Sequence, residues 1–476
     1  NGTWWIDPTS SDITGTGVPE KTVHISAESV TEQTGSTVDL RGGGDLFAYR
    51  WVSGVGGTKD ILASSARFAA IPSYTADYAP FAPFNPTAVN TNLGGDAGYA
   101  NAGLAVGDRV YLSGVAGLPA GNYTLLPARY ALLPGAFLVT PKNGVPPAAA
   151  VVQPDGASVV AGYRFNDLNA ARTGSPLAAA FEVAPQSVVR ARAEYDDSLA
   201  NAFLLASATA HDAVPPRLPI DSGQLVLAAT SAMAIQGAVS AQAPAGGRGG
   251  LVDISSPIDI FIAGPGAAAP AGSLVLNSSE LNSFGAESLL IGGVRTTTDQ
   301  GSAIAVKTNN ITVNNSGAPL SGAEIVLAAS RSLTLAPGAT VTQTATLAAA
   351  ADTLLLGDAA TPGSGDGALL RVSGDATAQI VRRGVDASAV PALTIGAGAK
   401  VSGTSVTLDS THATTLNPSA IIGGQAIALD SGQITLQLAS AGSVPASSGL
   451  MLSGAALQGL QSAQSLSLLS YSSIAI

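Results

Sequence analysis

SVTLDS at residues 405–410 and AIALDS at residues 426–431 decide the fold that this sequence predicts. The two stretches begin 21 residues apart and share one pattern, in which every second residue is apolar. Successive side chains of a β-strand point to opposite faces, so Val406 and Leu408 should share one face, as should Ile427 and Leu429. A repeat of about 20 residues with two or three short strands is typical of a β-solenoid, whose stacked coils bury their apolar faces together.

The same alternation, punctuated by Gly, Asn and Asp, continues through residues 222–476. A longer internal similarity relates two stretches, QLVLAATSAMAIQGAVSAQ from Gln224 and EIVLAASRSLTLAPGATVTQ from Glu324. We therefore predict a β-solenoid shaft over 222–476 with about 12 coils. A β-sandwich of regularly spaced strands is the alternative, but a sandwich of this size would rarely repeat its own sequence.

Aromatic residues divide the chain into two parts. Of the 3 Trp, 10 Tyr and 10 Phe residues, all but three lie at or before Phe203. Residues 61–221 are also rich in proline, which cannot donate a ladder hydrogen bond. We predict β-solenoid coils at 1–60, an inserted mixed but mostly β module at 61–221, and the shaft at 222–476.

Two local elements of the module can be predicted. Residues 151–165 suggest a hairpin in which Pro154-Asp155-Gly156 supplies the turn. Residues 187–210 contain the best helix candidate, LANAFLLASATA, with Asp197 or Ser198 as a possible N-cap.

Composition excludes several classes of protein. The formal net charge is −11, which disfavours a nucleic-acid partner because phosphate binding needs a basic surface. The sequence has no cysteine, so disulfides, thiolate metal ligands and a cysteine nucleophile are excluded. No run of about 20 apolar residues marks a transmembrane segment. The first residues lack an initiator Met and the last read as an interrupted strand, so we expect an internal part of a longer polypeptide.

An aromatic-rich stretch is the best candidate ligand-binding surface, because amphipathic rings serve both sugar stacking and protein contacts. Its members are Tyr74, Tyr78, Phe81, Phe84 and Tyr99. The alternative is that these rings fill the core of the module itself.

No residue pattern indicates catalysis, a cofactor or a metal site. His211-Asp212 is the one place where an imidazole adjoins a carboxylate, and no nucleophilic serine accompanies it. Glu194, Asp196 and Asp197 form the densest acidic cluster, which could suit a paired-carboxylate polysaccharide enzyme. The acids of the shaft, such as Asp253, Asp259 and Asp409, are scattered. We predict a protein that is not an enzyme.

Three longer stretches resemble the filamentous haemagglutinin family, the large exoproteins of Gram-negative two-partner secretion systems. They are GGGDLFAYRWVSGVGGTKDIL at 42–62, GDRVYLSGVAGLPAGNYTLLPARYALLPGAFLV at 107–139 and LPIDSGQLVLAA at 218–229. The resemblance implies a right-handed parallel β-helix, export through an outer-membrane β-barrel transporter, and a role in adhesion or biofilm contact.

Three functions remain open at this point. The first is a non-catalytic segment of a secreted adhesin on the outer surface of a Gram-negative bacterium, binding a glycan or protein receptor on a host, matrix or neighbouring cell. The second is the stalk of a contact-dependent toxin-delivery exoprotein. The third is a polysaccharide-active β-helix enzyme.

Overall fold

A computed structural model describes residues 18, 21–54, 57–77, 79, 104–164, 178–298, 300–386, 389–437 and 449–476. Strands make up 47% of it and helices 9%, which confirms the predicted all-β class, and many of its sheets are parallel. The described chain forms two compact units. Among the described residues, the first unit takes those of 46–203, and the second takes those of 18–45 and 204–476.

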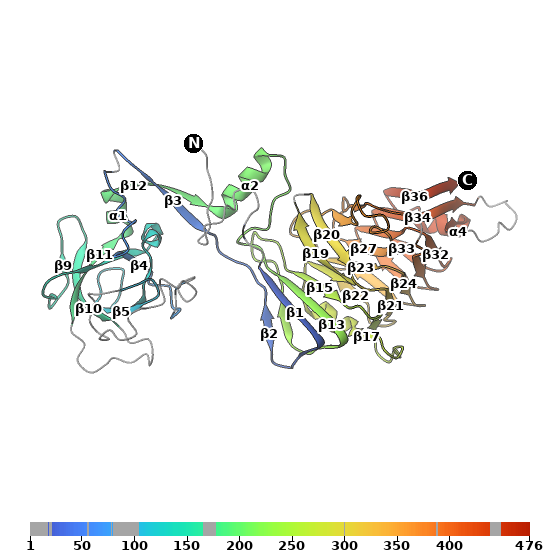
Figure 1. The fold of residues 1–476 in the computed structure, drawn as a ribbon, viewed down its shortest axis with the longest axis horizontal. Coiled ribbons are helices and arrows are strands. Elements are labelled where there is room, and N and C mark those ends of the chain that lie inside the picture. Colours follow the sequence, from blue (N-terminus) through green and yellow to red (C-terminus); the bar gives the residue numbers. More distant parts are fainter. Residues whose placement is uncertain are drawn as a thin grey trace. The chain divides into compact units, whose positions relative to one another are not determined.

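The second unit is organised by one ten-stranded sheet, here called the main ladder (Figure 1). All its strand pairs are parallel except the two made by β27, which runs antiparallel to both neighbours. The strands in order are β1 (Thr22–Glu32), β13 (Gln224–Ile235), β15 (Leu251–Ser255), β18 (Ser288–Ile291), β23 (Glu324–Ala329), β27 (Ala368–Ser373), β31 (Ser405–Ser410), β34 (Ala426–Leu436) and β36 (Ser465–Ala475), with β35 (Leu450–Leu452) also paired to β34.

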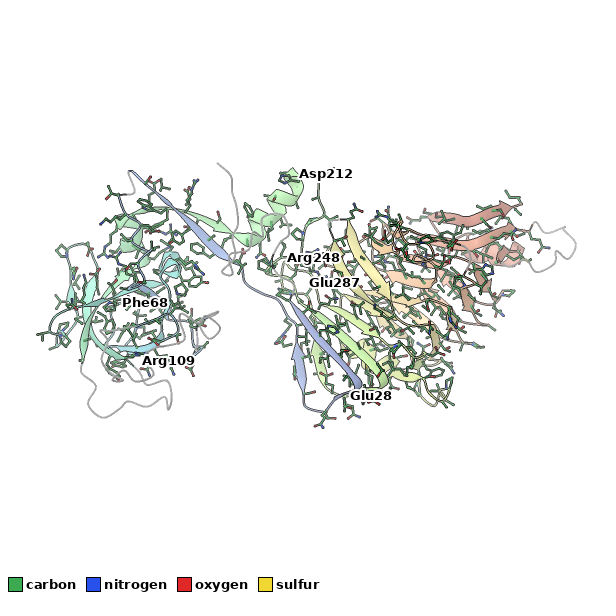
Figure 2. All side chains as sticks on the ribbon, viewed as in Figure 1. Glu28, Phe68, Arg109, Asp212, Arg248 and Glu287 are labelled. Carbon is green, nitrogen blue, oxygen red and sulfur yellow. The ribbon has the colours of Figure 1, made fainter. Side chains whose placement is uncertain are left out.

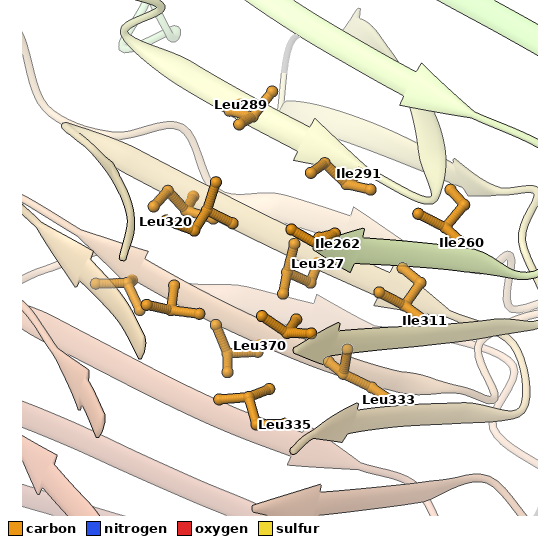
Figure 3. Close-up of a cluster of buried hydrophobic side chains, with 14 of the residues drawn as sticks. Ile260, Ile262, Leu289, Ile291, Ile311, Leu320, Leu327, Leu333, Leu335 and Leu370 are labelled. Atoms are coloured by element: carbon orange, nitrogen blue, oxygen red, sulfur yellow. The ribbon is translucent and has the colours of Figure 1, made fainter. Parts of the chain in front are cut away.

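Two continuous rows of apolar side chains run along one face of the main ladder. The first row consists of Leu225, Val252, Leu289, Ile325, Val372, Val406, Ile427 and Leu466. The second consists of Leu227, Ile254, Ile291, Leu327, Leu370, Leu408, Leu429 and Leu468. Figure 3 shows Leu289, Ile291, Leu327 and Leu370 within this layer. The predicted stacking of the 405–410 and 426–431 repeats, and the burial of their apolar residues, is confirmed.

Further sheets close the same core. One holds β17 (Leu274–Asn277), β16 (Ile260–Ala263), β21 (Asn310–Asn314), β24 (Ser332–Leu335), β29 (Ala392–Ile395) and β32 (Ala413–Leu416), all in parallel pairs. Another holds β22 (Leu320–Gly322), β25 (Thr340–Gln343), β30 (Lys400–Ser402) and β33 (Ile421–Gly423), and β2 (Thr37–Asp39) pairs with β14 (Ala238–Ser240). Helices α3 (Ser278–Ser283) and α4 (Gly454–Leu460) lie in the connections. One hydrophobic cluster joins the side chains of these sheets with those of the main ladder.

A four-stranded sheet covers part of the opposite face of the main ladder. It consists of β19 (Gly293–Thr298), β20 (Gly301–Val306), β26 (Leu354–Leu356) and β28 (Ile380–Arg382). The chain turns into it at Gly292, where φ is +102° and an added Cβ would lie 2.0 Å from the Ala328 carbonyl oxygen. In a second hydrophobic cluster, buried side chains of the covering sheet pack against buried side chains of the main ladder.

These excursions make the predicted number of coils wrong. The spacing of 21 residues holds from β31 to β34, but β23 begins at Glu324 and β27 only at Ala368. The intervening residues build β24, β25 and β26 before the chain re-enters the ladder. Within the described part of 222–476 the main ladder has nine of its ten strands, where about 12 coils were expected.

The first unit contains an eight-stranded antiparallel sheet with two hydrophobic clusters. Its strands are β6 (Gly121–Thr124), β5 (Arg109–Leu112), β10 (Ser158–Arg164), β11 (Ala179–Pro185), β8 (Phe137–Lys142), β4 (Phe68–Ala70), β7 (Leu126–Pro127) and β9 (Val151–Val152). A two-stranded sheet pairs β3 (Phe47–Val52) with β12 (Glu194–Leu199), and the helices η2 (Ala128–Leu132) and α1 (Gln186–Arg192) belong to the same unit. Helix α2 (Ala200–Ala210) begins in the first unit and continues into the second after Phe203.

The local predictions for the module fare differently. The hairpin is confirmed: β9 pairs with β10, and the Ala157 N–H donates to Asp155 Oδ1 across the turn at 3.0 Å. The helix is found as α2, but Asp197 and Ser198 lie in β12 and do not cap it.

The compact units divide the chain at other positions than the sequence suggested. Residues 46–60 group with the first unit, although they had been assigned to the coils, because β3 pairs with β12. Residues 204–221 group with the second unit. The chain still returns to the edge that it left: Val38 pairs with Val239, and the Gly223 N–H donates to the Leu40 carbonyl oxygen at 2.7 Å.

Leu429→Asp tests the inner face of the main ladder. Leu429 is fully buried, so the substitution would bury an unpaired carboxylate and should lower the free energy of unfolding by about 4 kcal/mol. Urea unfolding followed by circular dichroism measures the loss. Val390→Asp, at a side chain that is 72% exposed, is the control and should change stability by less than about 0.5 kcal/mol. Equal stability of the two variants would contradict the assigned rows.

Candidate functional site

The structure describes one of the five aromatic residues proposed as a ligand surface. Tyr74 is partly buried and packs against a hydrophobic cluster of the first unit, and its N–H donates to the Ile71 carbonyl oxygen at 3.0 Å. The Tyr74 ring therefore helps to fill the core of the first unit. Tyr78, Phe81, Phe84 and Tyr99 lie outside the described residues.

A different pair of aromatic side chains comes together on the sheet of the first unit. Tyr111 on β5 and Tyr163 on β10 are register partners, and their rings stack with centroids 4.8 Å apart and planes 16° apart. Both residues are partly exposed. Alternation in RVYL and VVAGYR could have placed both tyrosines on outward faces, but their pairing depends on which strands are neighbours. Stacked tyrosines offer an apolar surface with polar edges, suited to a sugar or a protein.

The second unit contains a cavity of about 690 Å³. It lies between α2, the loops around Pro215 and Pro244, and the segment Ala348–Thr353, and its lining is mostly apolar. The apolar lining residues include Leu205, Val214, Leu218 and the alanines at 348–351. A concave apolar pocket of this volume with a few polar groups is the usual form of a binding site.

Asp221 and Arg248 form the polar wall of this cavity (Arg248 is labelled in Figure 2). Asp221 is 1% exposed and accepts hydrogen bonds from the Leu218 N–H, the Arg248 N–H and Arg248 Nε, at 2.9, 2.8 and 2.7 Å. Burial opposes the charge of Asp221, but these hydrogen bonds and the Arg248 charge lower its pKa below the usual value. The pair thus fixes the two loops that frame the cavity.

Two further charged groups stand behind this wall. Arg217 Nη1 donates to the Gly249 carbonyl oxygen at 2.7 Å, and the Gly249 N–H donates to Glu287 Oε2. Burial lowers the pKa of Arg217, with repulsion from Arg248 adding to the effect, and burial raises the pKa of Glu287. An apolar cavity beside this charged cluster suits an amphipathic group, such as a side chain with an apolar stem and a polar end.

Two carboxyl groups are neighbours on the main ladder, one from the Asp of each LDS sequence. Asp409 and Asp430 are register partners in β31 and β34. Asp409 is fully buried and accepts hydrogen bonds from Arg382 Nε at 2.6 Å and from the Tyr471 hydroxyl at 3.0 Å. Burial, with repulsion from Asp409, raises the pKa of Asp430 to about 7. One guanidinium thus faces two carboxyl groups, and Asp430 binds its proton more tightly than an exposed aspartate does.

The acidic cluster and the His211-Asp212 pair are engaged in local contacts. On β12, Asp196 forms an ion pair with Arg50 at 2.5 Å, and Asp197 forms one with Arg190. His211 Nδ1 lies 2.8 Å from the Ser207 carbonyl oxygen at the end of α2. The sequence had named Asp409 only as a scattered acid, and the LDS repeat is the signal that could have paired it with Asp430.

Within the described ranges, no group of three or more His, Cys, Asp or Glu residues is placed to hold a metal ion. No helix in the same ranges combines the length and apolar character needed to cross a membrane. Comparison with family models, with curated proteins and with solved structures finds no match to this chain.

The Asp430 pair predicts an unusual pH dependence of stability. The pKa of Asp430 is raised from 3.8 to about 7 in the folded chain, so between these values the folded state binds more protons than the unfolded state. Stability from this group is complete below pH 3.8 and is lost as the pH rises toward 7, by at most about 1.4 kcal/mol per pH unit. Asp430→Asn should remove this slope, and urea unfolding of both proteins from pH 4 to pH 8 measures it. A wild-type-minus-variant difference that does not fall with rising pH would refute the raised pKa.

Proposed function

We propose that the second unit is a right-handed parallel β-helix and that the chain is a non-catalytic segment of a secreted adhesin. The observation that carries the proposal is the pair of apolar rows, which pass through the ladder from Leu225 and Leu227 to Leu466 and Leu468. Several sheets share the core behind these rows. A stack of this kind lengthens by one strand spacing with each coil, so it suits a protein that must extend from a surface.

The antiparallel strand β27 is the departure from a regular β-helix. Reversing a strand leaves its alternation intact, so Val372 and Leu370 still occupy the rows of Ile325 and Leu327. The proposed helix therefore contains one coil that enters the ladder in the opposite direction, with its core unbroken.

The resemblance to the filamentous haemagglutinin family supports the adhesin proposal. Its matching stretches include 107–139, which spans the tyrosine strand β5, and 218–229, which holds Asp221 of the cavity wall. We accordingly propose export through an outer-membrane β-barrel transporter, a place on the outer surface of a Gram-negative bacterium, and a glycan or protein receptor. The stalk of a contact-dependent toxin-delivery exoprotein would share this architecture.

A binding screen of the purified chain against immobilised glycans and matrix proteins tests adhesion. Ala349 is exposed and lines the cavity, so Ala349→Trp should fill part of it and weaken binding at least tenfold if the receptor group enters there. Ala345→Trp, at an exposed position of the same segment outside the cavity lining, is the matched control.

The double variant Tyr111→Ala/Tyr163→Ala reports on the other surface. Loss of binding in this variant alone would assign the receptor to the stacked tyrosines, at about 2 kcal/mol for each truncated ring that anchors the receptor. Wild-type protein that binds no glycan, no matrix protein and no cell surface would contradict the adhesin proposal.

A polysaccharide-active enzyme is the second candidate, and the Asp409–Asp430 pair is the observation that favours it. Retaining and inverting glycosidases both use a pair of carboxyl groups that flank the scissile bond. Release of reducing ends from neutral or acidic polysaccharides, abolished by Asp430→Asn, would establish this activity and overturn the non-catalytic proposal. We expect no release.

A further inference from the structure

The cavity of the second unit has a carboxylate that its own wall does not neutralise. Three charged side chains line this cavity: Asp221, Arg248 and Asp352. Asp221 and Arg248 form an ion pair, in which Arg248 Nε lies 2.7 Å from Asp221 Oδ2. Asp352 is partly exposed and makes no ion pair with any residue in the described part of the chain. The lining therefore has one unbalanced negative charge.

Asp352 is held in place through both its backbone and its side chain. Its carbonyl oxygen accepts a hydrogen bond from Nη2 of the fully buried Arg371 at 2.8 Å. The Ser302 N–H donates to the carbonyl oxygen of the next residue, Thr353, at 2.9 Å. The Ser302 hydroxyl donates to Asp352 Oδ2 at 2.7 Å. The carboxylate is thus positioned before any ligand arrives.

Apolar side chains form most of the remaining lining. The alanines at 348–350, which shortly precede Asp352, are exposed, and so are Leu205 and Val214, at 43% and 44%. An alkyl chain gains free energy when it is buried against such a surface. A ligand with an apolar stem and one cationic end therefore matches both the lining and its charge.

We propose that this cavity binds a lysine side chain of a receptor protein, with the methylene groups of the stem against the apolar lining and the ammonium group at Asp352 Oδ1. The second oxygen, Oδ2, already accepts the Ser302 hydroxyl. One remaining oxygen suits an ammonium group, which is a compact point charge, whereas a guanidinium group binds best to both oxygens of a carboxylate. The inference rests on the proposed adhesin function and names the class of its receptor.

Charge disfavours an anionic ligand in the same cavity. An anion would meet the unbalanced carboxylate of Asp352, whereas Arg248 already donates to Asp221 and to the Pro216 carbonyl oxygen. The chain as a whole has a formal net charge of −11, and a field of this sign favours the approach of basic partners.

Three probes that share a six-carbon chain test the preference of the cavity: hexylammonium, hexanol and hexanoate. Ligand-observed NMR titration of the wild-type chain at neutral pH measures the affinity of each. Hexylammonium should bind about tenfold more tightly than hexanol, because it adds a charge-assisted hydrogen bond, and hexanoate should bind most weakly. Hexanoate that binds as tightly as hexylammonium would overturn the proposal, as would hexylammonium that does not saturate a site.

Asp352→Asn removes the charge and keeps an oxygen that can accept the Ser302 hydroxyl. It should weaken hexylammonium binding about tenfold and leave hexanol binding unchanged. Asp358→Asn, at an exposed carboxylate outside the lining, is the matched control and should change neither affinity. Circular dichroism checks both folds, and the three probes test the wild-type chain even if a variant misfolds. An Asp352→Asn protein that still prefers hexylammonium to hexanol would overturn the proposal.

Acetylation of receptor lysines separates this inference from the adhesin proposal. A matrix protein that binds the wild-type chain should bind about tenfold more weakly after acetylation, which removes the ammonium charge, and Asp352→Asn should not respond to acetylation. Unchanged binding of the acetylated protein, or binding of glycans alone, would leave adhesion standing and remove the lysine site. A chain that binds hexylammonium but no glycan, matrix protein or cell surface would contradict the adhesin proposal and leave the cation preference of the cavity standing.

Discussion

The second unit depends on parallel pairing in a fixed register. Side chains alternate between the two faces of a strand, so a slip of one residue would move Leu408 from the core to the opposite face. Each inner strand, such as β31, lies between two others, so a slip would disturb both neighbouring pairs. Parallel strands also cannot be joined by a tight turn and need long crossovers. Those crossovers form the smaller sheets and helices α3 and α4. Apolar residues of the crossovers pack against the apolar rows of the main ladder and complete the core.

The opposite face of the main ladder is held by buried ion pairs. Asp253 pairs with Arg295 of β19, and Asp409 pairs with Arg382 of β28, at 2.7 and 2.6 Å. Desolvating such charges costs free energy that their attraction only partly recovers, so their stabilising effect is small beside that of the apolar rows. Their geometric effect is larger, because a misplaced covering strand would leave a buried charge unpaired. We interpret these pairs as fixing where the covering sheet docks, which also gives Asp409 a structural role.

Local patterns made the rows predictable and left the coils unpredictable. The alternation in SVTLDS and AIALDS fixes which residues are buried, whatever the strands on either side do. Strand direction is different: an alternating strand reads alike in both directions, so nothing in ALLRVS marks β27 as reversed. The covering strand β26 is the run LLL at 354–356, too short to show a period of two.

The candidate sites also differ in whether a repeated sequence pattern predicts them. Asp409 and Asp430 could be paired from the sequence, because the repeat that carries them sets their register. The Asp221–Arg248 wall could not, because it joins two irregular loops 27 residues apart that no periodic pattern relates. The boundary of the module was missed for a similar reason. Strand β3 looks like the coil strands before it, and only its pairing with the distant β12 places it in the first unit.

The insertion itself follows from the edge chemistry of the ladder. One edge of β1 would be left unpaired unless the chain returned to it. Strand β13, which follows the first unit in the sequence, supplies ten register partners along that edge. The entropy of closing a loop grows only with the logarithm of its length, so a long insertion adds little cost once those pairs form. The first unit has hydrophobic clusters of its own, which lets it vary in surface without disturbing the rows. The apolar rows and the partly exposed tyrosine pair, Tyr111 and Tyr163, therefore belong to different compact units.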